Sequence, residues 1–362
     1  MKVKLGKALE YEQPSKYIVE SEKYKNEYKT PVLTAGKSFI LGYTNETTGI
    51  YNNLPVIIFD DFTTDVKFVD FPFKVKSSAM KMLQPSSNEY NLKYFYYLIK
   101  FLNFQPTSHQ RHWISKFAEF EFNIPDRQKQ DEIVEKLDKM AEILSLKDKE
   151  LKKYDELIKS QFSEMFGNPL KNEKFPIKDL NEICDVRDGT HDSPKYHHAG
   201  YPLITSKNII NGEISFDDIN LISKEDYNKI NQRSYVDDGD ILMPMIGTIG
   251  NPAIVKRHRD FAIKNVALIK FHTNSKVINQ FILYAMKSDE FNSYLKEKNK
   301  GGTQKFVSLG IIRKTQMIVP PLELQNQFAT FVKHFDKLKF SIKQSIEKLE
   351  NCYNSLMQEY FN

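Results

Sequence analysis

Several short stretches hold residue types that enzymes use, but their spacing does not fit the chemistry. Gly247-Thr-Ile-Gly250 is glycine-rich, yet it lacks the spacing of a dinucleotide-binding loop, and no Lys-Ser/Thr pair follows it as a phosphate loop requires. His191-Asp192-Ser193 and His197-His198 suggest a metal or nucleophilic site, but no cysteine or second carboxylate stands at a ligand spacing. We therefore interpret these histidines as loop residues and predict neither a catalytic residue nor a metal site.

Two donor-rich loops are better candidates for a binding surface. Ser108–His112 and Gly301–Lys305 each lie ahead of a long helical stretch. Glutamine can pair with adenine, and arginine with guanine, through two hydrogen bonds in the major groove of DNA. We predict that these loops contact DNA through His109, Gln110, Arg111, His112, Gly301, Thr303, Gln304 and Lys305.

A second set of basic residues could fix the register of the protein on DNA by contacting phosphates. We predict this role for Lys37, Lys76, Lys81, Lys207, Arg233 and Lys264. For each residue the alternative is an ordinary solvated surface charge. Lys76 and Lys264 occupy equivalent places in an internal repeat, so a structural salt bridge at both places is a further alternative.

The segments that would position these residues occur twice. Ile124-Pro125 and Gln130 return 195 residues later, without a gap, as Val319-Pro320 and Gln325. Upstream, Phe73–Met80 matches Phe261–Leu268 at a shift of 188 residues. This pattern predicts two unequal globular units, each followed by a similar long helix, with approximate two-fold symmetry inside one chain.

Both long helical stretches carry the 4–3 spacing of a coiled-coil seam. In residues 126–166 the ten seam positions are Ile133, Leu137, Met140, Leu144, Lys147, Leu151, Tyr154, Ile158, Gln161 and Met165, and all but Lys147 and Gln161 are apolar. In residues 322–361 the ten seam positions are Phe328, Val332, Phe335, Lys339, Ile342, Ile346, Leu349, Tyr353, Leu356 and Tyr360, and all but Lys339 are apolar. A helix of about 40 residues spans roughly 60 Å. We expect an antiparallel rod that fixes the distance between the globular units, and the alternative is a dimerisation or scaffold device.

Composition sets broad limits on the class of protein. The 362 residues carry a formal net charge of +5. This excess is weaker than that of a typical stand-alone nucleic-acid binder but is compatible with one that shares its electrostatics with partners, and the alternative is an unremarkable charge for a chain of this size. Two cysteines, Cys184 and Cys352, exclude a disulfide framework and a cysteine-rich zinc site. No apolar run approaches the ~18 residues of a membrane span, and we expect a soluble, cytoplasmic protein.

Longer strings of the chain resemble the specificity (S) subunits of type I restriction–modification systems. The helix strings are Ile133-Val-Glu-Lys-Leu-Asp138, Val319-Pro-Pro-Leu-Glu-Leu-Gln325 and Ser355-Leu-Met-Gln-Glu-Tyr-Phe361. In the first globular unit they are Lys29–Lys37, Gly42–Asn45, Phe59–Thr64 and Ser77–Lys81. In the second they are Asp188–Pro194, Ile204–Asn208, Gly239–Leu242 and Met245–Asn251. The chain departs from many members in starting almost directly in the first recognition domain.

The resemblance implies a fold and a division of the chain. We expect an α+β (mixed α/β) fold with two target-recognition domains separated by two long conserved helices packed as an antiparallel coiled coil. The recognition domains would be residues 1–122 and 168–317, and the helices residues 123–167 and 318–362.

The resemblance also implies a non-catalytic role in recognising a bipartite, asymmetric DNA target. Two methylation subunits and motor-nuclease restriction subunits would be the partners, and S-adenosylmethionine, ATP and magnesium would bind to them rather than to this chain. The sequence agrees, because Asn168-Pro169-Leu170 and Asn251-Pro252-Ala253 both depart from the Asn-Pro-Pro-aromatic motif of adenine methyltransferases. Two alternatives remain: a self-contained methyltransferase or nuclease, and a coiled-coil adaptor that binds no nucleic acid.

Overall fold

The computed structural model describes residues 2–34, 38–104, 106, 111–171, 173–247, 249–298 and 306–362. The chain divides into two units: unit 1 comprises Met1–Asp148 and Lys343–Asn362, and unit 2 comprises Lys149–Ile342. The long helices α4 (Arg127–Phe166) and α10 (Leu322–Phe361) are each divided between the two units. None of the helices in the described ranges is both long and apolar enough to cross a membrane.

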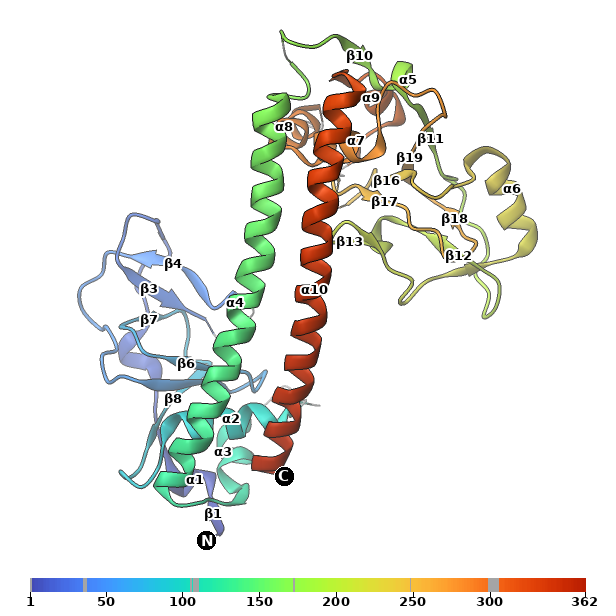
Figure 1. Ribbon diagram of the computed structural model, residues 1–362. Helices are drawn as coiled ribbons and strands as arrows, with labels where there is room; N and C mark the ends of the chain where they lie inside the picture. The colour runs from blue at the N-terminus through green and yellow to red at the C-terminus, as the bar shows by residue number, and fades with distance from the viewer. Residues whose placement is uncertain are drawn as a thin grey trace. The chain divides into compact units, whose positions relative to one another are not determined.

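Unit 1 is built on two small sheets and a short strand pair (Figure 1). The four-stranded sheet has the order β2 (Leu9–Glu12), β8 (Met80–Pro85), β5 (Val56–Asp60), β6 (Val66–Val69). The three-stranded sheet has the order β4 (Ile40–Thr44), β3 (Thr30–Leu33), β7 (Lys74–Val75), and β1 (Lys2–Lys4) pairs with β9 (Glu121–Asn123). The helices are α1 (Leu5–Ala8), α2 (Leu92–Leu102) and α3 (His112–Ser115), with 3-10 turns at Pro14–Tyr17 and Phe117–Glu119. Apolar residues of α2 share a core with β5 and β8.

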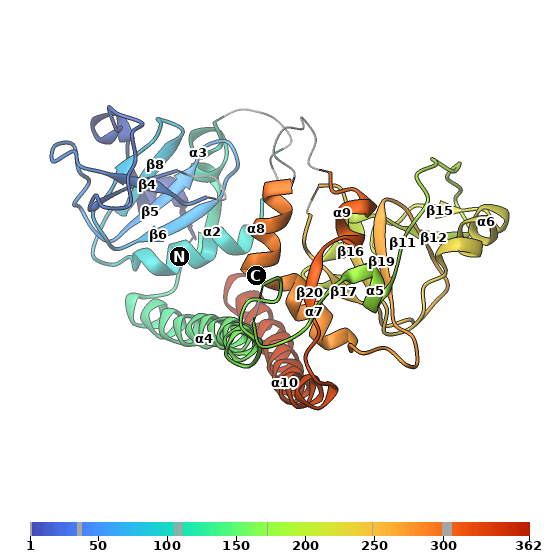
Figure 2. The same ribbon diagram turned by 90° about the horizontal axis from the view of Figure 1, so that it is seen from above.

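Unit 2 repeats this plan with longer insertions. Its four-stranded sheet has the order β11 (Asp185–Asp188), β19 (Val266–Lys270), β16 (Ile241–Pro244), β17 (Ala253–Ile254). The three-stranded sheet is β15 (Leu221–Ile222), β12 (Tyr201–Ile204), β18 (Ala262–Ile263), and the strand pairs are β10 (Ile177–Asp179) with β20 (Gln316–Ile318) and β13 (Ile209–Ile210) with β14 (Glu213–Ile214). The helices are α5 (Leu180–Ile183), α6 (Lys224–Ser234), α7 (Asn279–Lys287), α8 (Asp289–Lys298) and α9 (Leu309–Arg313), with a 3-10 turn at Ser206–Asn208. Figure 2 shows both units from a second direction.

The two units are therefore related by the predicted repeat. The strands that match at a shift of 188 residues, β7 and β18, each pair in parallel with their neighbours: Val32 lies opposite Lys74, and Leu203 lies opposite Ala262. The β1–β9 pair in unit 1 corresponds to the β10–β20 pair in unit 2. This short pair is how the first unit closes near its N-terminal end, a point that the sequence alone leaves open.

The predicted seams of the long helices are confirmed. Every one of the twenty seam positions is buried or half-buried. In unit 1 the first part of α4 packs on the last part of α10, with Leu137 and Met357 in one core. In unit 2 the last part of α4 packs on the first part of α10, where the rings of Phe162 and Phe328 lie 5.3 Å apart. Because residue numbers rise along one helix and fall along the other, the packing is antiparallel.

A buried glutamine fastens the first turn of each long helix to its globular domain. Gln130 in α4 donates to the carbonyls of Glu89 (3.1 Å) and Pro125 (2.9 Å), and its Oε1 accepts the N–H of Asn91 (2.8 Å). Gln325 in α10 makes the same three bonds: to the carbonyls of Lys276 (3.0 Å) and Pro320 (2.7 Å), and from the N–H of Ile278 (2.9 Å). Both side chains are almost completely buried. We call this arrangement the glutamine clasp.

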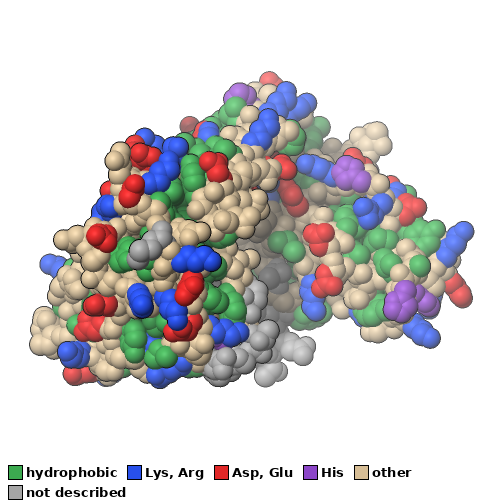
Figure 3. Space-filling model, turned by 90° about the horizontal axis from the view of Figure 1, so that it is seen from below, with side chains coloured by type: hydrophobic (Ala, Val, Ile, Leu, Met, Phe, Trp, Pro, Cys, Tyr) green, Lys and Arg blue, Asp and Glu red, His purple; other side chains and the backbone are tan. Residues whose placement is uncertain are grey.

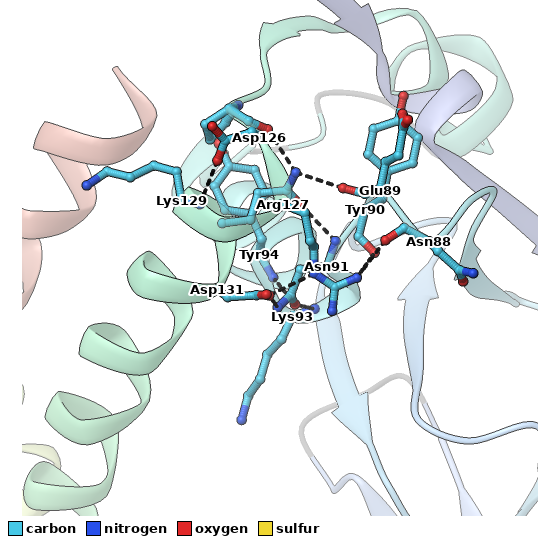
Figure 4. A network of polar contacts seen from close by, with 12 residues as sticks. Asn88, Glu89, Tyr90, Asn91, Lys93, Tyr94, Asp126, Arg127, Lys129 and Asp131 are labelled. Atoms are coloured by element: carbon cyan, nitrogen blue, oxygen red, sulfur yellow. Dashed lines mark hydrogen bonds and ion pairs between the residues drawn. The ribbon is translucent and has the colours of Figure 1, made fainter.

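Unit 1 reinforces its clasp with a charged network at the helix surface (Figure 4). Arg127 donates to the carbonyls of Asn88 (2.9 Å) and Tyr90 (3.4 Å), and its Nε contacts Asp131 at 2.8 Å. Asn91 Nδ2 donates to the same Asp131 carboxylate at 2.6 Å. The residues before α2 are therefore held to α4 by both a buried and an exposed set of bonds.

Removing either clasp should destabilise its unit. Gln130→Leu or Gln325→Leu leaves two carbonyls and one N–H without the amide that pairs with them. Since a buried unsatisfied group costs about 1–3 kcal/mol, we expect the free energy of unfolding to fall by about 2–4 kcal/mol in urea denaturation. The exposed neighbours Gln128→Leu and Gln327→Leu are matched controls and should change it by less than about 0.5 kcal/mol. Equal losses in variants and controls would contradict this role.

Candidate nucleic-acid interface

The predicted DNA-contacting residues divide into those that the structure describes and those that it does not. Arg111 is exposed and lies just ahead of α3. Seven residues lie outside the described ranges and stay predictions: Lys37, His109, Gln110, Gly301, Thr303, Gln304 and Lys305.

Two of the predicted contacts are wrong because the side chains are buried. Lys81 is fully buried in β8, and its Nζ lies 3.2 Å from Oδ2 of Asp61, which is also buried. His112 is 1% exposed, and its ring packs 5.6 Å from the ring of Phe104. Asp61 accepts the N–H of Trp113 at 3.0 Å, and its carbonyl accepts the N–H of His112 at 2.9 Å. Lys81, Asp61 and the start of α3 therefore form an internal support, out of reach of DNA.

Lys76 and Lys264 hold equivalent backbone positions but have different side-chain partners. Their N–H groups donate to Leu33 and Ile204, each at 2.9 Å. The Lys76 ammonium pairs with Glu22, as the salt-bridge alternative predicts, whereas Lys264 Nζ donates to Ser193 Oγ at 2.6 Å. The Lys76 pair is exposed on the Glu22 side and contributes little to stability.

In unit 2 the loop Asp188–Ser193 gathers several basic and polar side chains. Asp188, which is 7% exposed, accepts from Arg233 Nη2 through Oδ1 and from His191 Nε2 through Oδ2 at 2.8 Å. His191 Nδ1 lies 2.8 Å from Asn265 Oδ1. Gly189 permits the close packing of the loop, because a Cβ there would lie 2.3 Å from the carbonyl oxygen of Ile263.

The hydrogen bonds to Asn265 and Asp188 raise the pKa of His191 above its usual value. A histidine whose pKa is raised in the folded state adds stability below its unfolded pKa of about 6.5, and that stability is lost as the pH rises through the folded pKa. The folded protein therefore favours the charged imidazolium.

Lys207 lies at the end of the three-stranded sheet of unit 2 where β12 and β18 terminate. It is exposed in the turn that follows β12, and Lys264 follows β18, the parallel neighbour of β12. Because the carboxyl ends of parallel neighbours meet at the same end of a sheet, Lys207 and Lys264 lie at one end of this sheet. Arg233 of α6 contacts Asp188 and Gly189, and the next residue, Thr190, forms a bridge with Lys264.

Sequence reasoning overlooked one basic run. Lys256-Arg257-His258-Arg259 lies between β17 and β18, and four consecutive basic residues were a signal that could have found it. The Arg257 guanidinium lies 4.4 Å from the centre of the Tyr235 ring, and that of Arg259 lies 4.7 Å from the centre of the Phe216 ring.

On the face in Figure 3, Lys and Arg side chains lie among Asp and Glu side chains rather than in one continuous basic surface. No metal-binding group of three or more His, Cys, Asp or Glu side chains occurs in the described part of the chain.

Comparison with known proteins now identifies the family. Residues 1–153 and 169–351 match the family described as the type I restriction modification DNA specificity domain. The chain belongs to this family. One matched segment includes the globular domain of unit 1, and the other includes that of unit 2.

Two relatives agree with this assignment. The chain is 54% identical over 126 residues to the specificity subunit of the Escherichia coli type I restriction enzyme EcoR124I/EcoR124II, a match that covers 33% of this chain and 31% of that protein. It is 26% identical over 202 residues to the putative type I restriction enzyme MjaX specificity subunit of Methanocaldococcus jannaschii, a match that covers 52% of this chain and 46% of that protein. These matches therefore span a third to a half of the relatives' own lengths.

Two solved structures share the fold over the whole chain. The S subunit of a type I restriction–modification system from M. genitalium aligns with a TM-score of 0.59 at 16% identity, covering 100% of this chain and 96% of that one. A structure from work on complex assembly and conformational transition of the type I R-M system aligns with a TM-score of 0.55 at 14% identity, covering 100% and 97%. The expected α+β fold with two recognition domains and two long helices is confirmed.

The contrast between Lys81 and Lys76 can be tested directly. Lys81→Met leaves the Asp61 carboxylate buried without its cation, and we expect a loss of about 3–5 kcal/mol in the free energy of unfolding. Lys76→Met removes an exposed pair and should cost less than about 1 kcal/mol. Both are measured by urea denaturation, alongside binding to random duplex DNA. A stable Lys81→Met variant with weakened DNA binding would restore Lys81 as a phosphate contact.

Proposed function

We propose that this chain is the non-catalytic specificity subunit of a type I restriction–modification complex, and that it recognises a bipartite, asymmetric DNA target in the cytoplasm. The observation that carries the proposal is the duplicated unit in a chain of this family. The same framework, fastened by the same glutamine clasp, occurs twice and carries different loops. Two frameworks of one kind suit two half-sites, and different loops suit two different half-site sequences.

Partner subunits would perform the chemistry. Two methylation subunits, holding S-adenosylmethionine, would methylate adenine in each half-site, and motor-nuclease subunits would use ATP and magnesium for restriction. Supporting this division, the long helices keep apolar side chains in solvent, such as Phe340 (63% exposed) and Leu146 (54% exposed). Exposed apolar surface of this kind suits contact with another protein.

Two other functions make different predictions. A self-contained methyltransferase or nuclease would bind S-adenosylmethionine, so measurable binding by the purified chain would favour it. A coiled-coil adaptor without a nucleic-acid role would show no salt-dependent affinity for DNA, whereas phosphate contacts make affinity fall steeply with salt. The basic side chains at one edge of unit 2 favour the DNA-binding function.

The proposed target can be read from methylated DNA. In a host that expresses this chain with its methylation partner, we expect methylated adenines in two different half-sites separated by a fixed gap. The expectation follows from the difference between the loops around Arg111 and Gln304. Methylation profiling checks it, and a perfectly palindromic target would refute the asymmetry.

We further propose that the long helices set the length of the gap. Four residues inserted beside Lys147 would lengthen α4 by ~6 Å. With a rise of about 3.4 Å per base pair, the preferred gap should grow by one or two base pairs while both half-site sequences stay the same.

The control is the same insertion at the exposed turn around Asn26, which should leave the gap unchanged. Methylation profiling of both variants measures the result. Efficient methylation at the original spacing in the Lys147 variant would show that the distance is set by other parts of the complex.

A further inference from the structure

The loop Asp188–Ser193 contains a histidine whose contacts favour one protonation state. Both ring nitrogens of His191 face oxygen acceptors, Asn265 Oδ1 and Asp188 Oδ2, each at 2.8 Å. A neutral imidazole has only one N–H, so it can donate to only one of these oxygens. The imidazolium donates to both. The geometry therefore selects the charged form, in agreement with the raised pKa of His191.

The charge of this surface changes when His191 loses its proton. Charged groups on this surface include Asp188 and, next to His191 in the chain, Asp192. Arg233 from α6 contacts Asp188, and Lys264, between β18 and β19, donates to Ser193. Loss of the His191 proton removes one positive charge from this surface.

The same surface keeps hydrogen-bond donors available to an anion. Arg233 contacts Asp188 and Gly189 through Nη2, and its Nε and Nη1 have no partner in the described ranges. The side chains of Arg233 and His191 are 65% and 55% exposed, so both can reach a ligand. Asp188, held under them at 10% side-chain exposure, keeps the two cations side by side.

We propose that Arg233, Lys264 and His191 bind neighbouring backbone phosphates of the DNA target, and that protonation of His191 adds one such phosphate contact. The inference rests on the proposed DNA-binding function and adds a site and a dependence on pH to it. A phosphate is the group that DNA offers in every sequence, so the contact should act on cognate and random DNA alike.

The test is the binding of the full chain to a labelled random duplex over a series of salt concentrations, at pH about 6 and about 9. Each phosphate neutralised adds about 0.9 to the slope of log affinity against log salt. We expect the wild-type slope to be steeper by about 0.9 at the lower pH. His191→Gln keeps a hydrogen-bonding side chain without a charge, and its slope should be the same at both pH values.

Matched variants separate this effect from other titrations. His334→Gln, at an exposed position on α10, should keep the wild-type difference between the two pH values. Arg233→Gln removes a fixed cation and should reduce the slope of log affinity against log salt by about 0.9 at both pH values. Thermal unfolding confirms that each variant is folded.

The outcomes distinguish this inference from the proposed function. Salt-dependent DNA binding in which His191→Gln retains the wild-type pH difference overturns the inference and leaves the function standing. An unchanged slope in Arg233→Gln likewise removes the phosphate site. Absence of salt-dependent binding by the wild-type chain at either pH would overturn both.

Discussion

Gln130 and Gln325 lie in the first turns of α4 and α10, and each side chain pairs with three backbone groups outside its own helix. A primary amide suits this place because it offers two donors and an acceptor in one plane, and each glutamine uses them on two carbonyls and one N–H. The accepted N–H belongs to the residue just before α2 or α7, so each clasp joins the long helix to the start of a core helix. The orientation of each helix on its globular domain depends on this contact.

A framework held in this way tolerates different loops. In unit 1 the buried pair of Lys81 in β8 and Asp61 after β5 holds the start of α3 behind the exposed Arg111. In unit 2 the exposed cluster lies around Asp188 at the end of β11, with two cations over one carboxylate. The mild net charge of +5 is thus compatible with DNA binding, because local arrangement rather than bulk charge determines which cations face a phosphate.

Features that depend on local periodicity could be predicted from the sequence. The seams of α4 and α10 follow from the heptad spacing, and even Lys147 and Lys339 in the seam are half-buried as the pattern requires. Features that depend on distant partners could not. Lys81 in β8 resembles a surface lysine until Asp61, which follows β5, is placed beside it, and the contacts of His191 involve Asn265, 74 residues away. The sheet order was equally inaccessible, because it arises from pairing between strands that are far apart in the chain.

The most direct test of the clasp is native-state hydrogen exchange at the amides of Asn91 and Ile278. An amide just before a helix has no intrahelical acceptor, so without the glutamine it would exchange rapidly. With Gln130 and Gln325 in place, both amides should exchange only when their units unfold, as slowly as amides in the core strands β5 and β16. Exchange as fast as that of exposed loop amides would contradict the account.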